Sequence, residues 1–195
     1  MNHLSKLLII LILFSLNSCS KDKKVISAIK EVNQQDEMIT AYNEGIQGIR
    51  DGDAFYAAKK FLEAELLYPQ SDWASKSVLM ASYSYYLQNY YFEAINNLER
   101  FIKTYPKDSR MAYAHYLLGM CYYENIESEK KDLEPLVIAK MQFNIVIDNY
   151  PGTDFALDSK FKIDLINDVL ASKETYVGRH YIKKEKWIAA INRFK

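Results

Sequence analysis

The chain has few of the residues that usually carry catalysis or bind metals. Its 195 residues include only two cysteines and three histidines, and the histidines stand far apart. No pair of them has the helical spacing of metal ligands, and no glycine-rich loop that could cradle a phosphate occurs. Cys121 lies inside an apolar helical pattern, which favours a buried side chain over a nucleophile. We therefore expect no catalytic residues and no metal site.

An excess of charge of either sign is also missing. The chain has 25 basic and 25 acidic residues, and loss of Lys6 with an amino-terminal peptide would leave 24 and 25, a net charge of −1. This balance gives no electrostatic basis for binding nucleic acid, so we expect no nucleic-acid partner.

Long apolar runs are absent except at residues 7–14, directly after Lys6. Such a run is about half of the ~20 residues that a helix needs to cross a bilayer, and the layout is typical of a signal peptide. We predict a lipoprotein signal peptide at residues 1–18.

The residues that end this segment, Leu16-Asn17-Ser18-Cys19, resemble a lipobox. In such signals the peptide is cut before the cysteine, which receives lipid. The resemblance therefore implies a lipid anchor on Cys19, no other cofactor, and a lipidated linker over residues 19–36; a chance cysteine after a plain signal peptide is the alternative. Because Ser20 and not aspartate follows, the resemblance points to the outer membrane.

Proline is scarce, and three of the four prolines follow tyrosine, where each pair is expected to end a helix. A hydroxyl that could cap the next helix follows each pair, at Ser71, Ser109 and Thr153. Apolar residues precede each proline at the same offsets, with the 4,3 spacing of one helical stripe. These residues are Ala57, Phe61 and Ala64; Ala94, Leu98 and Phe101; and Ala139, Phe143 and Val146. Small residues that would let two helices cross closely precede the stripes at Gly45, Ser82 and Gly119.

This punctuation resembles the tetratricopeptide repeat, a hairpin of two helices that recurs about every 34 residues. We predict an all-α fold, a tetratricopeptide α-solenoid of antiparallel helical hairpins. Repeats one to three are expected over 37–152, with helices at 37–51, 54–67, 74–88, 91–104, 110–124 and 135–149 and an insertion at 124–136. Residues 153–195 are expected to form a long helix, or two nearly continuous ones, and a second-type helix from Trp187. The last hairpin, repeat four, is then incomplete, so we expect the sequence to be a fragment.

The most specific feature is Gly178-Arg179-His180-Tyr181 followed by the stretch from Trp187 to Phe194. With the lipobox, the Tyr-Pro punctuation and the interrupted third repeat, it resembles the BamD family over nearly all of residues 19–195. The resemblance implies a lipid-anchored scaffold on the periplasmic face of the outer membrane that helps to assemble β-barrel proteins. It implies as partners a BamA-like barrel subunit, other lipoproteins of the β-barrel assembly machinery, and unfolded outer membrane proteins.

Within that family the amino-terminal repeats contact substrates, so residues 37–149 would be the substrate side and 153–195 the side that faces BamA. One stripe of each first helix is apolar, and in the second and third repeats most of its residues are tyrosines, which suit an extended peptide bearing aromatic residues. The expected groove residues are Tyr42, Leu79, Tyr83, Tyr86, Tyr113, Tyr116, Met120 and Tyr123. The alternative is that these side chains only fill the packing between repeats.

The matched segment also contains Arg179, Asn192 and Arg193, which we predict to bind a partner, since an arginine makes forked contacts with carboxylates. An arginine that is solvated or paired within the chain is the alternative. The competing function is that of another lipid-anchored periplasmic tetratricopeptide scaffold, for example one that coordinates envelope constriction with cell-wall synthesis.

Overall fold

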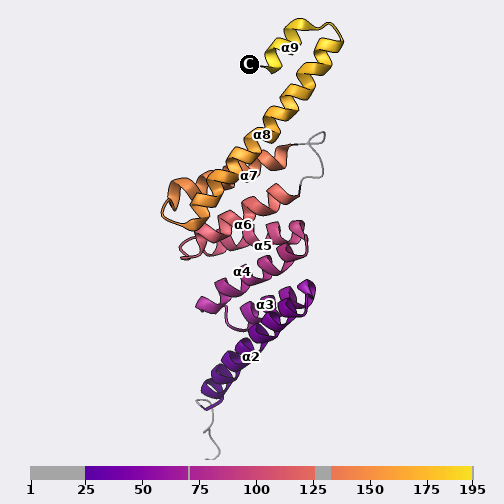
Figure 1. The fold of residues 1–195 in the computed structure, drawn as a ribbon. Coiled ribbons are helices and arrows are strands. Elements are labelled where there is room, and N and C mark those ends of the chain that lie inside the picture. The colour runs from indigo at the N-terminus through magenta and orange to yellow at the C-terminus, as the bar shows by residue number, and fades with distance from the viewer. Residues whose placement is uncertain (1–24, 70, 126–132, 195) are drawn as a thin grey trace, which may run out of the picture. The chain divides into compact units, whose positions relative to one another are not determined.

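The computed structural model describes residues 25–69, 71–125 and 133–194. The chain divides into two units, Met1–Asp36 and Glu37–Lys195, and the packing below concerns the second. Every regular element in the described residues is an α-helix (Figure 1), which confirms the all-α prediction. The helices are α2 Val25–Arg50, α3 Ala54–Leu67, α4 Asp72–Leu87, α5 Tyr91–Thr104, α6 Met111–Glu124, α7 Glu134–Asn149, α8 Asp154–Lys183 and α9 Trp187–Arg193.

The helix bounds agree with the predicted ones to within two residues, except at the start of α2. Helices α3 and α5 have the predicted bounds, and α8 is one continuous helix. Helix α2 begins at Val25, so the part of the expected linker from residue 25 to 36 is helical. That stretch contains no proline or glycine, the two residues that most strongly disfavour a helix interior. The predicted signal peptide and Cys19 lie outside the described residues.

Only one of the three expected hydroxyl caps forms. The Thr153 hydroxyl accepts a hydrogen bond from the Ala156 backbone N–H, at 3.2 Å. The Ser71 hydroxyl instead donates to the Tyr68 carbonyl at 2.7 Å and caps nothing, and α6 begins after Arg110 and not after Ser109. The Asp53 carboxylate, which follows Gly52 in the first turn, caps α3 by accepting from the Tyr56 N–H at 2.9 Å.

Helices of one hairpin cross where a glycine lies under an aromatic ring. A Cβ added to Gly45 would lie 2.8 Å from the Phe61 ring, and one added to Gly119 would lie 2.7 Å from the Phe143 ring. Phe61 and Phe143 are both fully buried. Ser82 holds the same position in the second hairpin, where it is buried and its hydroxyl donates to the Val78 carbonyl of its own helix. The small residues expected at these crossings therefore have a steric reason.

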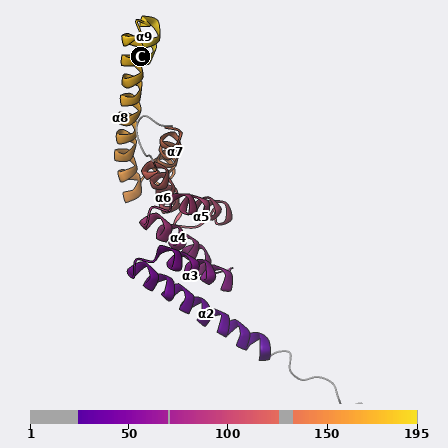
Figure 2. The ribbon, with the colours of Figure 1, turned by 90° about the vertical axis from the view of Figure 1, so that its right-hand side faces the viewer.

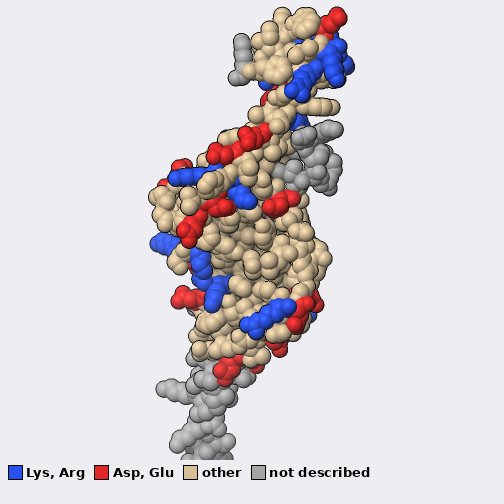
Figure 3. Space-filling view, viewed as in Figure 1, with Lys and Arg blue, Asp and Glu red and all other residues tan. Residues whose placement is uncertain are grey.

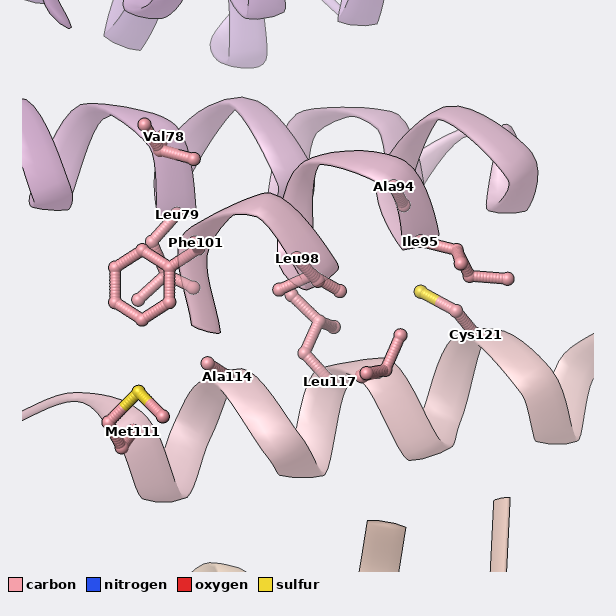
Figure 4. Close-up of a cluster of buried hydrophobic side chains, with 11 residues drawn as sticks. Val78, Leu79, Ala94, Ile95, Leu98, Phe101, Met111, Ala114, Leu117 and Cys121 are labelled. Carbon is pink, nitrogen blue, oxygen red and sulfur yellow. The ribbon is translucent and has the colours of Figure 1, made fainter. Parts of the chain in front are cut away.

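Consecutive helices from α3 to α7 pack against one another (Figures 1 and 2), and their facing stripes form a layered core. The central cluster joins α4, α5 and α6 (Figure 4). It includes Leu98 and Phe101, which are fully buried, and each such side chain contributes about 1.5–3 kcal/mol to folding. Helix α8 packs on α6 and α7 and then runs on beside α9, past the end of α7.

Candidate partner-binding surface

The eight residues predicted to line a groove separate into two groups. Tyr42, Leu79 and Met120 are at most 7% exposed, so they belong to the packed interior and offer little surface to a peptide. Tyr42 lies edge-on to the Phe61 and Trp73 rings, with centroids 5.1 and 5.0 Å apart. Leu79 is directed into the cluster between α4, α5 and α6 (Figure 4). These three positions fit the packing interpretation.

The other five, Tyr83, Tyr86, Tyr113, Tyr116 and Tyr123, are partly exposed. They lie on the first helices α4 and α6, as the spacing predicted. On the face shown in Figure 3, a broad area over α4–α6 carries no lysine, arginine, aspartate or glutamate. These tyrosines are the part of the predicted groove that can still meet a partner.

Two of these tyrosines also hold α8 in place. The rings of Tyr113 and Tyr116 each lie 5.3 Å from that of Phe155, centroid to centroid. The Tyr116 hydroxyl donates to a carboxylate oxygen of Asp158 at 2.7 Å. Burial, and then this hydrogen bond, raises the pKa of Tyr116 far above that of a free phenol. Substituting Tyr116 would therefore disturb the fold as well as any bound peptide.

The remaining tyrosines present uncharged aromatic faces. The rings of Tyr86 and Tyr91 lie 6.0 Å apart, centroid to centroid. Burial raises the pKa of Tyr86 to about 12, and the nearby Glu124 carboxylate adds to this shift. The Lys162 ammonium lies 5.1 Å from the centre of the Tyr123 ring, within the range of a cation–π contact. At neutral pH this surface offers ring faces and neutral hydroxyls, which suit an extended apolar or aromatic segment.

Residues of the carboxy-terminal signature hold the α8–α9 hairpin together. A Cβ added to Gly178 would lie 2.4 Å from the Phe194 ring, which repeats the glycine-aromatic crossing of the first and third hairpins. The Arg193 guanidinium pairs with the Glu174 carboxylate at 3.0 Å, and both side chains are about half exposed. An exposed pair of this kind contributes at most about 1 kcal/mol and leaves the arginine open to a partner.

The other two predicted partner residues lie apart from each other. Asn192 lines a hollow of about 550 Å³ on α9 beside Trp187 and Ile188. Arg179 lines a second hollow, which α8 alone forms. Both residues are exposed, and they face different hollows.

Two polar contacts between repeats were not predicted from the sequence pattern. The Arg100 guanidinium donates two hydrogen bonds, of 2.6 and 2.8 Å, to the buried Glu65 carboxylate, and the Tyr105 hydroxyl donates a third at 3.1 Å. They join α3 to α5 across 35 residues of sequence. The only hint was that Glu65 directly follows the buried Ala64, a place where a carboxylate needs a partner.

Arg110 makes the second of these contacts. Its guanidinium donates to both oxygens of Asp108, at 2.6 and 2.7 Å, and to the Ser75 hydroxyl at 2.7 Å. The hydrogen bond from Arg110 lowers the pKa of Asp108 to about 2. This contact ties the loop before α6 to the first turn of α4.

The described residues contain no cluster of three histidine, cysteine, aspartate or glutamate side chains that could hold a metal ion. Burial raises the pKa of the Cys121 thiol to about 12, so it is neutral at physiological pH. None of the helices in the described ranges has the length and hydrophobicity needed to cross a bilayer.

Comparison with known proteins gives a family and several relatives. The family model YfiO, described as an outer membrane lipoprotein, matches residues 34–195. An outer membrane protein assembly factor BamD of Caulobacter vibrioides is 39% identical over 154 residues, which are 79% of this chain and 50% of the relative. The BamD of Rickettsia prowazekii is 39% identical over 156 residues, 80% of this chain and 62% of the relative.

A more distant BamD, from Vibrio cholerae, is 25% identical over 162 residues, 78% of this chain and 67% of the relative. The chain therefore spans between half and about two thirds of the length of these relatives.

Proposed function

The chain belongs to the BamD family of outer membrane lipoproteins, and on that premise we propose that it is a non-enzymatic scaffold of the β-barrel assembly machinery. The observation that carries the proposal is the 39% identity to two assembly factors over about four fifths of the chain. The names of these relatives favour barrel assembly over coordination of envelope constriction.

The lipid anchor belongs to this proposal. Acylation of Cys19 would hold the chain on the periplasmic face of the outer membrane, because several acyl chains together bind a bilayer stably where one does not. Replacing Cys19 by alanine should move the protein from the membrane fraction to the soluble periplasmic fraction.

Substrate contact is assigned to the partly exposed tyrosines of α4 and α6. An unfolded barrel protein presents extended strands with aromatic side chains, and neutral tyrosine rings provide flat apolar contacts with hydroxyls that can still bond to water or backbone. The matching partners would be unassembled outer membrane proteins.

Contact with a BamA-like barrel subunit, and with other lipoproteins of the machinery, is assigned to residues 153–195. Arg193 supports this assignment because its guanidinium is half exposed and its intrachain pair with Glu174 is weak enough to exchange. Arg179 and Asn192 are exposed on the same two helices.

Controlled depletion of the protein in its native host tests the proposal. Folded barrel proteins in the outer membrane should fall, while inner membrane proteins keep their levels. Unchanged barrel levels, together with a defect in septation or cell-wall synthesis, would support the competing scaffold function instead.

A further inference from the structure

The turn between α4 and α5 carries exposed aromatic rings next to the start of α3. The Phe55 ring lies 4.3 Å from the Tyr90 ring and 5.6 Å from the Tyr85 ring, centroid to centroid. Phe55 is 48% exposed and Tyr90 is 37% exposed, while Phe92, two residues after Tyr90, is 73% exposed. Large rings that pack on one another and stay this open provide apolar contact area for a partner.

These rings adjoin the partly exposed tyrosines of α4 and α6 to which substrate contact is assigned. Tyr86 is one of those tyrosines, and its ring lies 6.0 Å from that of Tyr91. The Tyr91 hydroxyl donates to Asn89 Oδ1 at 2.7 Å, and Asn89 directly precedes Tyr90. The aromatic surface therefore continues from α4 around the turn to the start of α3.

Two side-chain amides in this turn are each bonded at one end only. Gln88 Nε2 donates to the Gly52 carbonyl in the turn before α3, and Asn89 Oδ1 accepts from Tyr91. Within the described ranges, Gln88 Oε1 and Asn89 Nδ2 have no hydrogen-bond partner, and both residues are exposed. An open acceptor and an open donor on neighbouring residues match the N–H and C=O groups of an extended peptide.

The backbone of the turn holds these side chains in place. Asn89 has a φ of 64°, in the left-handed region that asparagine tolerates. The backbone N–H groups of Asn89 and Tyr90 donate to the carbonyls of Tyr86 and Tyr85, each at 3.0 Å. Because the turn is already ordered, a ligand would lose little of its binding free energy to ordering it.

The turn itself is uncharged, since residues 87–92 contain no lysine, arginine, aspartate or glutamate. The neighbouring carboxylates belong to Glu93, which follows the turn, and to Asp51 and Asp53 in the turn before α3. The two aspartates already accept hydrogen bonds within the chain. Lys59, one helical turn after Phe55 on α3, is an exposed cation on this border. The surface therefore suits a neutral ligand better than an anionic one.

We propose that a turn cluster formed by Phe55, Gln88, Asn89, Tyr90 and Phe92 binds an extended, uncharged segment of an unfolded polypeptide. The two amides bond to the backbone of the segment, and the rings pack on its aromatic or apolar side chains. The inference rests on the proposed role with unfolded barrel proteins. It adds a second contact region, beyond the tyrosines of α4 and α6.

Other occupants fit this surface less well. Anionic lipid headgroups and nucleic acid meet carboxylates here, because Glu124 also lies close to Tyr91. A neutral glycan presents mostly hydroxyls, whereas each peptide unit presents the one donor and one acceptor that the amides match. A second folded copy of the chain offers few open backbone groups, because helices bond their own N–H and C=O groups.

The first test removes the open donor without removing the turn. The probe is a dye-labelled peptide of about eight residues, a usual strand length, that alternates phenylalanine with threonine. Its binding to the full chain is measured by fluorescence anisotropy. Asn89→Asp keeps an oxygen for Tyr91 and tolerates the left-handed turn, but replaces the Nδ2 donor by an oxygen. We expect it to weaken binding at least about tenfold.

Matched variants separate this effect from charge and from loss of structure. Asn96→Asp, at an exposed asparagine on α5, adds the same charge and should change the affinity by less than about twofold. Tyr90→Leu should weaken binding at least about fivefold, whereas Tyr90→Phe keeps the ring and should retain most of it. Tyr56→Leu on α3, where the tyrosine is 42% exposed, is the control for loss of an exposed ring.

Equal effects of Asn89→Asp and Asn96→Asp, or of Tyr90→Leu and Tyr56→Leu, would overturn the proposal. So would displacement of the peptide by an N-acetylglucosamine oligomer at lower concentration than by unlabelled peptide, since a glycan would then be the ligand. Self-association in sedimentation that is lost on Tyr90→Leu would identify a second copy instead. Depletion of the protein tests the scaffold role separately, so barrel levels that fall while these variants bind normally overturn this inference alone.

Discussion

Gly119 lies directly beneath the ring of Phe143, so closely that a Cβ at this position would approach the ring carbon Cε1 to 2.7 Å. Both residues are buried, and Phe143 is fully enclosed. The crossing of α6 and α7 therefore depends on the absence of a side chain at one residue.

Replacing Gly119 by alanine should destabilise the protein. Overpacking costs about 1–3 kcal/mol, and the better helix propensity of alanine returns at most about 1 kcal/mol. We expect a net loss of free energy of unfolding, measured by urea denaturation.

Two other glycines serve as controls for this prediction. Gly152→Ala should change stability by less than about 0.5 kcal/mol, because no atom lies within 4 Å of the added carbon. Gly178→Ala should cost less than Gly119→Ala, since Phe194 is half exposed and its ring can move away. A Gly119→Ala protein as stable as the wild type would contradict the close crossing.

Asp108 should make stability depend on pH in the acid range. Its pKa is lowered from 3.8 to about 2, chiefly by the hydrogen bond from Arg110. A carboxyl whose pKa is lower in the folded than in the unfolded chain stabilises the fold above the unfolded value. That stabilisation should be lost as the pH falls from about 4 to about 2.

The variant Asp108→Asn lacks this titration, so its urea midpoint should fall less than that of the wild type between pH 4 and pH 2. Asp164→Asn, an exposed carboxylate on α8, is the matched control and should follow the wild type. Identical pH profiles for Asp108→Asn and wild type would rule out the contribution.

Some of the partly exposed tyrosines on α4 and α6 also pack against other helices. The choice of residue therefore separates a loss of peptide binding from a loss of packing. The double variant Tyr83→Ala with Tyr123→Ala should lower the affinity for a carboxy-terminal barrel peptide by at least about tenfold, as expected when two aromatic contacts are lost. Tyr56→Ala on the second helix α3, also an exposed tyrosine, should not. Isothermal titration calorimetry measures both.

Tyr116 is better tested by Tyr116→Phe, because its hydroxyl is bonded to Asp158. Loss of that bond should lower stability by about 1 kcal/mol and leave peptide affinity unchanged. If the wild type and the double variant of Tyr83 and Tyr123 bind the barrel peptide with equal affinity, these tyrosines do not belong to the substrate site.

Arg193 can act through Glu174 or through a partner, and charge reversal distinguishes the two. Arg193→Glu should reduce co-purification of the BamA-like subunit while shifting stability by no more than about 1 kcal/mol, since the pair with Glu174 is exposed. The swap Arg193→Glu with Glu174→Arg restores the pair. If co-purification returns with the swap, Arg193 acts within the chain and not on a partner.

The helices and their crossings could largely be predicted because they follow local rules. Tyrosine-proline pairs end α3, α5 and α7, and the 4,3 stripes become the buried residues of those helices. Phe61 follows Gly45 by 16 residues and Phe194 follows Gly178 by 16, while Phe143 follows Gly119 by 24 because of the insertion. The contact between Gly178 and Phe194 could have been predicted from that offset.

The candidate site could be predicted only in part, because burial depends on neighbours far away in sequence. The spacing places Tyr42, Leu79 and Met120 on the predicted groove stripes of their helices. Yet all three are covered by other helices. The contact of Glu65 with Arg100 spans 35 residues and has no local pattern. The early start of α2 was missed, although Val25, Ile29 and Val32 have the 4,3 spacing of one helical stripe.

We propose that the chain is a scaffold of the machinery that assembles outer membrane barrels. Affinity purification of the protein from its native host in mild detergent tests it most directly. We predict that a BamA-like barrel subunit co-purifies in near-stoichiometric amount and is reduced by Arg193→Glu. Absence of any BamA-like subunit from the purified wild-type complex would contradict the claim.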